Sequence, residues 1–92
     1  MKRGVIMNML DNVATLLDDL EEKETVTCKG LSDAVELAAL GKIARGHKIA
    51  LADIRKGEAV VKYGFEIGYA LCDIERGSFV HVQNVGSKQT EE

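Results

Sequence analysis

The most regular pattern of apolar residues lies between residues 11 and 22. Its apolar members follow the i, i+3, i+4, i+7 spacing that places side chains on one face of a helix: Val13, Leu16, Leu17 and Leu20. Asp11 stands where a carboxylate can accept backbone N–H groups of a first helical turn. The acidic residues that follow oppose the helix dipole near a C-terminus. The pattern therefore predicts one amphipathic helix over 11–22, with its end near residue 22.

Shorter segments show the alternation or the β-branched composition that is typical of strands. Residues 4–9 and 25–28 are the first two of these segments. Residues 34–40 are ambiguous on pattern alone. Their Ala and Leu content favours a helix that Gly41 would end, whereas their apolar residues also alternate as in a strand.

A four-residue phrase, Ile-x-x-Gly, recurs at 43–46, 54–57 and 74–77. Each copy predicts a tight turn, in which the isoleucine enters the core and the glycine adopts a conformation that other residues rarely take. The runs after these glycines and after Gly64 predict four further strands. Their bounds are 48–51, 59–62, 65–71 and 78–82. We therefore expect an α+β, mainly β domain that has a single helix.

The composition of the chain limits the classes of protein to which it can belong. The chain has 92 residues, of which 46% are hydrophobic and 29% charged, with no proline, so one small ordered domain is expected. We assign residues 1–85 to the domain and 86–92 to a polar tail. The net charge of −3 is not that of a nucleic-acid-binding surface. No apolar run is long enough to cross a membrane, and the first residues do not form a secretory signal, so we expect a cytoplasmic location.

The two cysteines, Cys28 and Cys72, form no C-x-x-C pair. A structural zinc site with four ligands is therefore not expected. In a cytoplasmic chain we expect both thiols to be reduced and largely buried.

The two histidines are the main candidates for chemistry. His47 and Lys48 open one predicted strand, where they can bind an anion or simply form the solvated end of the strand. Strand alternation would place His81 and Gln83 together on an open face, with Val80 and Val82 pointing inward. Such a pair can bind a hydroxyl, a carboxylate or a metal, or can be an ordinary polar face. No complete catalytic motif is present.

One long stretch resembles a known family. Residues 46–64 read Gly-His-Lys-Ile-Ala-Leu-Ala-Asp-Ile-Arg-Lys-Gly-Glu-Ala-Val-Val-Lys-Tyr-Gly. Further matching pieces are Asp11-Asn12-Val13-Ala14, Ile67-Gly68, Asp73-Ile74-x-x-Gly77 and Val80-His-Val-Gln-Asn84. Together they resemble the N-terminal domain of altronate and galactarate dehydratases, a member of the SAF group with the β-clip fold. The resemblance covers roughly residues 4 to 85 and implies that 34–40 is a strand.

The resemblance implies a small subunit of a sugar-acid dehydratase (a hydro-lyase) that is not active alone. A separate large subunit would carry a divalent metal, with iron as the candidate, and remove the α-proton. This chain would hold no cofactor. Sulfolactate sulfo-lyase, a relative, is similarly divided.

Five residues would bind the substrate: His47, Lys48, His81, Gln83 and Asn84. Lys48 would pair with a carboxylate, and His81 and Asn84 would hydrogen-bond hydroxyls. The family pattern is His-x-His-Asn, and Gln83 stands where it has its second histidine. A glutamine cannot act as a general base and is a poor ligand for iron or zinc.

Two other classes of function stay open at this point. The chain could be a non-enzymatic binding module for a carbohydrate or a protein, since relatives of this fold occur in sialic-acid synthases and in flagellar and pilus assembly proteins. It could also be a purely structural subunit. A homo-oligomer is compatible with each of these readings.

Overall fold

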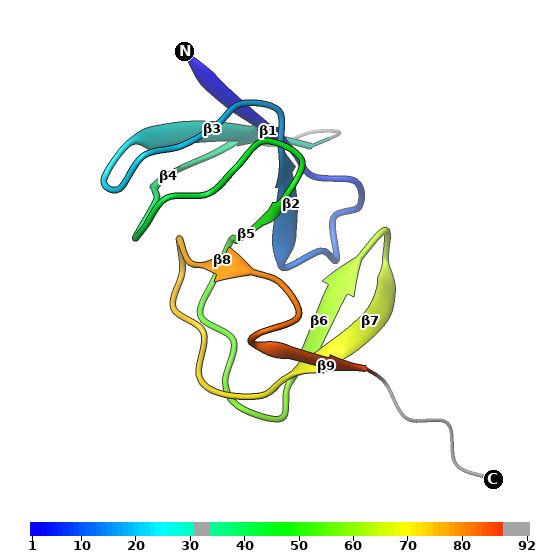
Figure 1. The fold of residues 1–92 in the computed structure, drawn as a ribbon. Coiled ribbons are helices and arrows are strands. Elements are labelled where there is room, and N and C mark those ends of the chain that lie inside the picture. The colour runs from blue at the N-terminus through cyan, green and yellow to red at the C-terminus, as the bar shows by residue number, and fades with distance from the viewer. Residues whose placement is uncertain (31–33, 88–92) are drawn as a thin grey trace, which may run out of the picture.

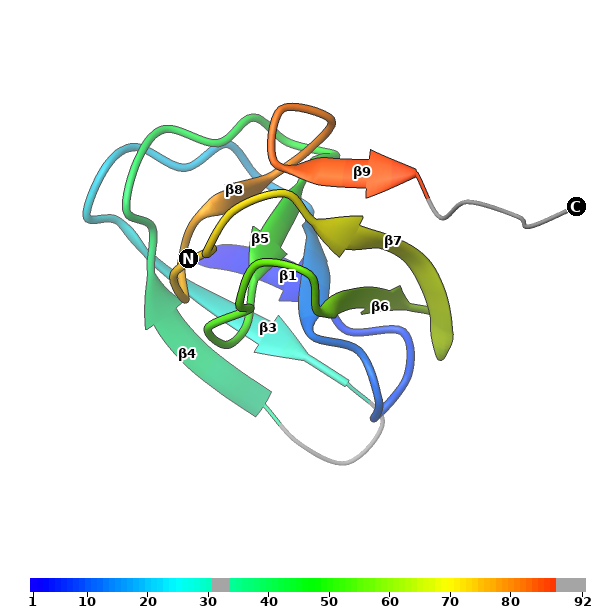
Figure 2. The same ribbon diagram turned by 90° about the horizontal axis from the view of Figure 1, so that it is seen from below.

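The computed structural model describes residues 1–30 and 34–87, which form nine strands. Six strands make a mixed sheet in the order β4 (Ala34–Ala38), β3 (Thr25–Lys29), β1 (Lys2–Val5), β2 (Val13–Leu16), β5 (Lys48–Ala50) and β8 (Phe79–Val80). The second sheet has the order β6 (Ala59–Lys62), β7 (Phe65–Ala70) and β9 (Val85–Ser87). All neighbours are antiparallel except β1 and β3. Figure 1 shows the smaller sheet below the larger one, and Figure 2 shows β7 beside β9.

The predicted helix over 11–22 is wrong: the described ranges contain no helix, and this segment forms β2 followed by turns. The backbone of β2 is paired on both sides, with β1 and with β5. Both of its faces are covered, because Val13 belongs to one core cluster and Ala14 and Leu16 to another. Leu17, which the helix would bury, is 39% exposed. Pairing in the sheet therefore overrides the helical spacing.

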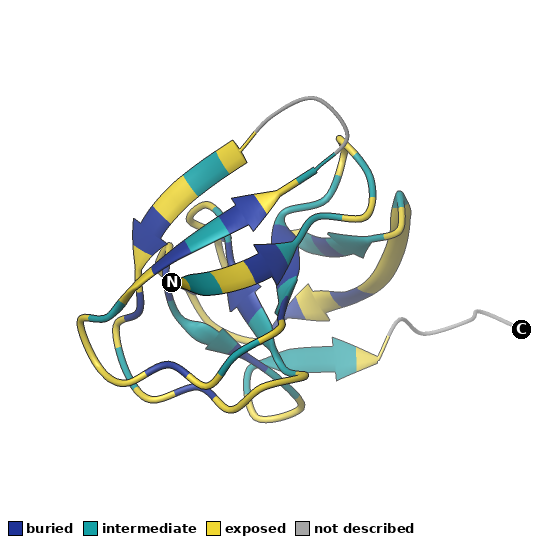
Figure 3. Cartoon of the chain, turned by 90° about the horizontal axis from the view of Figure 1, so that it is seen from above, coloured by how far each residue is buried: buried dark blue, intermediate teal, exposed yellow. Residues whose placement is uncertain are grey.

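Two apolar clusters lie on opposite faces of β2 and β5. The first cluster is Ala14, Leu16, Leu20, Val26, Cys28, Leu37, Ala39, Ile43 and Ile49. The second is Val13, Ala50, Ile54, Val60, Ala70, Ile74 and Val80. Figure 3 shows buried positions alternating with more exposed ones along the strands, as the period of two requires. Strand β5 contributes to both clusters, with Ile49 in the first and Ala50 in the second.

The Ile-x-x-Gly phrases form tight turns, as predicted, and these turns are joined two by two through backbone hydrogen bonds. We call each six-residue segment around a phrase a clasp; the clasps cover 42–47, 53–58 and 73–78, and a fourth covers 19–24. Ile54 and Ile74 exchange both backbone hydrogen bonds, at 2.8 and 2.7 Å. Leu20 and Ile43 exchange theirs at 2.8 and 2.9 Å. The fourth clasp follows the same pattern with Leu20 in the isoleucine position.

Carboxylates lock the clasps together. The Asp53 carboxylate accepts the backbone N–H of Arg76 at 2.8 Å, and Asp73 accepts that of Lys56 at the same distance. Asp19 accepts the N–H of Arg45 at 2.7 Å in the other pair. Asp53 and Asp73 each directly precede the isoleucine of a phrase. Their side chains bridge from one clasp to the next.

The fifth residue of each clasp lies in the left-handed backbone region. Three of these residues are glycines, with φ of +89° at Gly46 and Gly57 and +94° at Gly77. The fourth is Lys23, with φ of +73°. A side chain at such a φ is strained, which explains why glycine recurs there.

Other expectations have mixed outcomes. The segment 34–40 is a strand over Ala34–Ala38, as the resemblance implied. Cys28 is buried, but Cys72 is exposed, so the expectation of two buried thiols is wrong for Cys72; both are free. Of the predicted tail, residues 86 and 87 belong to β9, and 88–92 lie outside the described residues.

Candidate functional site

The Asp11-Asn12 motif fixes the smaller sheet to the rest of the domain. Asn12 Nδ2 donates to the carbonyl of Ala59 at 3.0 Å, and Asn12 Oδ1 accepts the N–H of Val61 at 2.8 Å. Asp11 Oδ1 accepts the N–H of Gly64 at 2.8 Å. Asp11 therefore caps a hairpin turn rather than a helix. The motif positions β6 and β7 against the core.

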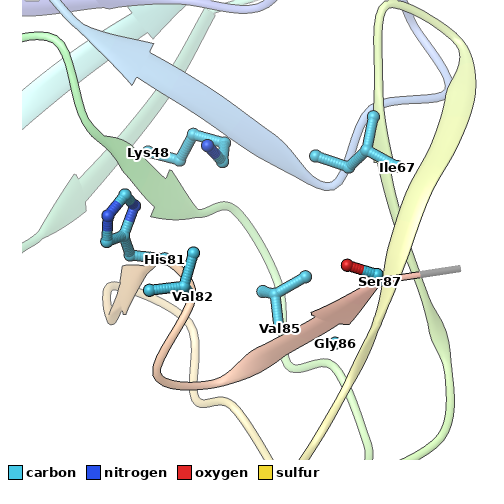
Figure 4. Close-up of a pocket in the computed structure, with 7 residues that line it drawn as sticks. All are labelled: Lys48, Ile67, His81, Val82, Val85, Gly86 and Ser87. Atoms are coloured by element: carbon cyan, nitrogen blue, oxygen red, sulfur yellow. The ribbon is translucent and has the colours of Figure 1, made fainter.

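A pocket of about 220 Å³ opens between the two sheets. Figure 4 shows Lys48 on one wall, His81 and Val82 beside it, and Ile67 on the opposite side. The full lining is Lys48, Ile67, His81, Val82, Val85, Gly86 and Ser87. The lining combines a lysine, an imidazole and a hydroxyl with apolar walls. This is a suitable set for a small polar molecule with one anionic group.

Lys48 supplies the positive charge of the pocket. It opens β5 and is paired with Thr15 on one side and Val80 on the other, so it shares a face with the second core cluster. Burial, and then repulsion from Lys62, lower the pKa of the Lys48 ammonium below its ordinary value. Lys48 has no ion pair or side-chain hydrogen bond among the described residues. A bound carboxylate would supply the missing counter-charge.

His81 is held in place by aromatic contacts. Its ring stacks on Phe79 with centroids 5.5 Å apart, and His47 meets it edge-on at 5.3 Å. His47 also contacts Phe79 edge-on at 5.4 Å. Nδ1 of His47 is buried, and no group in residues 1–30 or 34–87 forms a hydrogen bond with it. The structure thus brings His47, Lys48 and His81 together, with His81 and Lys48 lining the pocket and His47 behind them.

A β-bulge directs Ile67 into the pocket. Val60 pairs with Gly68, but Val61 pairs with Glu66, so Ile67 is an extra residue in β7. Bulges next to binding sites often redirect a side chain in this way. Ile67 was not predicted from the sequence, because one extra residue in a strand leaves no mark in the apolar pattern. Val85, Gly86 and Ser87 were not predicted either, and the last two had been placed in the tail.

The expected geometry of residues 81–84 is wrong. Strand β8 ends at Val80, and the following residues form a turn, so strand alternation does not apply there. Val82, expected to point inward, is 75% exposed. Gln83 is exposed and does not line the pocket.

The side chain of Asn84 forms hydrogen bonds with the backbone of this turn. Its Nδ2 donates to the carbonyl of Phe79 at 2.8 Å, and its Oδ1 accepts the N–H of His81 at 3.0 Å. The side chain therefore shapes the turn that presents His81. Direct binding of substrate by Gln83 and Asn84 stays a prediction.

Residues 1–30 and 34–87 offer neither a metal-binding cluster nor a membrane-spanning helix. No three His, Cys, Asp or Glu side chains are grouped so that they could hold a metal ion. No helix there is long and apolar enough to span a membrane.

The curled sheets are consistent with a β-clip, and the pocket makes the domain a candidate binding module for a small anion. The chain belongs to the altronate/galactarate dehydratase SAF domain family, whose family model matches residues 2–88.

Several relatives are enzymes much longer than this chain. The altronate dehydratase of Escherichia coli is 47% identical over 78 residues, which are 85% of this chain and 15% of that protein. The altronate dehydratase of Bacillus subtilis is 40% identical over 84 residues, or 91% of this chain and 16% of that protein. The chain thus spans about one sixth of these dehydratases.

A shorter relative is a named subunit. The (2R)-sulfolactate sulfo-lyase subunit alpha of Paracoccus pantotrophus is 40% identical over 53 residues, which are 58% of this chain and 79% of that subunit. The same domain type therefore occurs both inside long enzymes and in a short subunit.

Proposed function

We propose that this chain is the substrate-binding small subunit of a dehydratase that acts on a sugar acid or a related hydroxy acid. A separate catalytic polypeptide would complete the site and carry the divalent metal, with iron as the candidate. The observation that carries the proposal is Lys48, which is partly desolvated in a pocket beside His81 and has no ion pair within the described part of the chain. The family membership supplies the reaction class.

The role of Lys48 follows from its surroundings. A carboxylate in the pocket would relieve the cost of holding a partly buried ammonium without a partner. His81 lies beside it and can hydrogen-bond a substrate hydroxyl through a ring nitrogen. These contacts orient the substrate, which lowers the barrier of a reaction whose bond-breaking groups belong to the catalytic polypeptide.

The relatives support a divided enzyme. In the altronate dehydratases about 85% of the chain lies outside the matched stretch, and the sulfo-lyase relative is itself a subunit. The proposed partner is a polypeptide similar to that unmatched part. Altronate, galactarate and sulfolactate are the substrates to test first, because these compounds appear in the names of the relatives.

The test is reconstitution. The tagged chain is purified from its own cells, and a co-purifying polypeptide is identified by its similarity to the unmatched part of the dehydratases. The complex is then assayed for release of a 2-oxo acid or of sulfite from the three substrates. Activity of the complex, and of neither component alone, would support the proposal. Absence of such a partner, or a complex inactive on every carboxylate tried, would refute it.

Variants separate a substrate-binding role from a structural one. Lys48→Met should lower kcat/KM by roughly 10–100-fold, the value of a hydrogen bond to a charged group. Lys48→Arg should recover part of the loss. The matched control is Lys56→Met, which removes an exposed lysine from a clasp. If Lys48→Met and His81→Phe both leave turnover intact, the chain is a structural subunit.

A further inference from the structure

The hairpin between β6 and β7 ends in a turn of unusual composition. Lys62 pairs with Phe65, so Tyr63 and Gly64 form a two-residue turn, with φ of +58° and +76°. Turns with two positive φ values favour Asn, Asp or Gly at both positions. A tyrosine there is strained, and its side chain is nevertheless 54% exposed. The ring meets the Lys62 ammonium 5.0 Å from its centroid, a contact worth about 0.5–1 kcal/mol at an exposed site. A side chain at a left-handed φ costs about 1–2 kcal/mol. The local fold therefore holds this tyrosine at a net cost, which points to a role outside the domain.

A second tight turn lies against the first and has the same character. Asn8 and Asp11 close it through a 3.0 Å backbone hydrogen bond, and its two central residues are Met9 and Leu10. Met9 is 88% and Leu10 69% exposed, although solvent-exposed turns normally carry polar residues or glycine at such positions. Two neighbouring turns therefore both expose large apolar side chains.

Several contacts hold the two turns together. Asp11 Oδ1 accepts the N–H of Gly64 at 2.8 Å. A Cβ on Gly64 would lie 2.9 Å from the side-chain nitrogen of Asn8, so the two turns are in direct contact. The exposed side chains thus project from a fixed support.

We call the exposed side chains Met9, Leu10, Tyr63 and Phe65 the tip patch. Phe65, the first residue of β7, is 73% exposed. Because an aromatic side chain carries about 150–250 Å² of surface, the two rings alone expose roughly 200–300 Å². That area is typical of the apolar centre of an interface, which takes about 800 Å² from each partner.

The position of the tip patch indicates what covers it. Strand β7 leads from Phe65 directly to Ile67 in the pocket wall. Strand β9 runs antiparallel to β7, with Ser87 opposite Gly68, so it points toward the tip. The match to the dehydratases lies in their N-terminal region, so in those enzymes the remaining chain continues from the end of β9. A polypeptide that continues from Ser87 would start at the pocket wall and on the side of the sheet that leads to the tip patch.

We propose that the tip patch is the docking surface for the catalytic polypeptide, and that docking there closes the pocket. This inference rests on the proposed function, because it needs that partner to exist. Tyr63 and Phe65 would be its central contacts, as aromatic residues commonly are. The strain at Tyr63 would then be the cost of presenting an aromatic ring at the end of the hairpin.

The experiment compares stability with affinity in the complex isolated as above. Tyr63→Asn places a favoured residue in the turn, so it should raise the Tm of the free chain while weakening partner affinity at least ~30-fold, the loss expected at an interface hot spot. Phe65→Thr should weaken affinity similarly. The control is Leu40→Thr, which removes a half-exposed leucine two residues beyond the end of β4 and should leave affinity unchanged. Affinity is measured by biolayer interferometry with the identified partner immobilised.

Each outcome has a definite reading. If the partner binds and the Tyr63 and Phe65 variants keep full affinity, the docking surface is wrong although the proposed function stands. If no such partner exists, both fail. If the free chain is a dimer in analytical ultracentrifugation and Phe65→Thr makes it a monomer, the patch binds a second copy and the inference is overturned.

Discussion

Gly57 and Gly77 offer a direct test of how the clasps are built. They occupy the same position of paired clasps and have nearly the same φ, +89° and +94°. Their surroundings differ: a Cβ on Gly57 meets nothing within 4 Å, whereas one on Gly77 would lie 2.4 Å from the carbonyl oxygen of Ala38. Alanine at position 57 should therefore report the cost of backbone strain alone, and alanine at position 77 the cost of strain together with steric overlap.

The expected losses follow from these two terms. Gly57→Ala should lower the free energy of unfolding by about 1–2 kcal/mol, the cost of a left-handed residue that has a Cβ. Gly77→Ala should lower it by about 2–5 kcal/mol, because overlap with a backbone atom adds an overpacking cost. The matched control is Gly41→Ala, whose Cβ meets nothing and whose φ lies outside the left-handed range. It should leave stability unchanged or raise it by up to about 1 kcal/mol.

Urea unfolding followed by circular dichroism measures all three variants. Equal losses for the alanines at 57 and 77 would show that the carbonyl of Ala38 moves away freely. A loss at 57 no larger than that of the Gly41 control would refute the strain argument for every clasp.

The remaining predictions concern single side chains. Lys23→Gly should raise the free energy of unfolding by up to about 1 kcal/mol, because it removes the strained side chain from the one clasp that lacks glycine at its left-handed position. The control Glu22→Gly should not raise it. Urea titrations of both variants measure the difference. Burial raises the pKa of the Cys28 thiol to about 11, so iodoacetamide at pH 8 should label Cys72 and spare Cys28 until the chain unfolds, as peptide mass spectrometry would show. Folding lowers the pKa of Lys48, so just below the ordinary value of 10.5 the unfolded chain binds more protons, and the free energy of unfolding should rise with pH there. Lys48→Met should remove this rise. A rise of unchanged size in urea titrations of the variant would contradict the assignment.

Sequence patterns predicted the turns better than the helix. Backbone sterics alone favour glycine at a positive φ, so the turns of the Ile-x-x-Gly phrases could be predicted from four neighbouring residues. The spacing of Leu16 and Leu20 also fits a helix, but Leu16 is buried in β2 and Leu20 in a clasp. That choice depends on pairing with β1 and β5, which the local sequence does not encode.

The fourth clasp, 19–24, was missed for a simple reason. Lys23 stands where the others have glycine, so a search for Ile-x-x-Gly passes over it. The acceptor Asp19 corresponds to Asp53 and Asp73, and Glu24 corresponds to Glu58. Both glutamates accept a backbone N–H within their own clasp, at 2.8 Å. An alignment of the segments on their acidic residues would have revealed the repeat.

The candidate site was predicted in part. Lys48 and His81 do line one pocket, because both lie at the ends of the neighbouring strands β5 and β8. Gln83 was placed by extending a strand that ends at Val80, whereas Asn84 was proposed because it matches the asparagine of the family pattern. Ile67 depends on a bulge, and its contribution could be seen only in three dimensions.

The place of β1 within the larger sheet has a consequence for how the chain is made. Lys2–Val5 lies between β2 and β3, and only β1 joins the β3–β4 hairpin to the rest of that sheet. On a ribosome β1 is made before the other eight described strands, and its parallel partner β3 follows some twenty residues later. The strands of this sheet therefore cannot pair in the order of their synthesis. The edge of β1 that pairs with β3 stays unpaired until β3 has been made. A short peptide spanning β1, added to a chain that lacks it, should restore the sheet, much as a missing strand is supplied in fragment complementation.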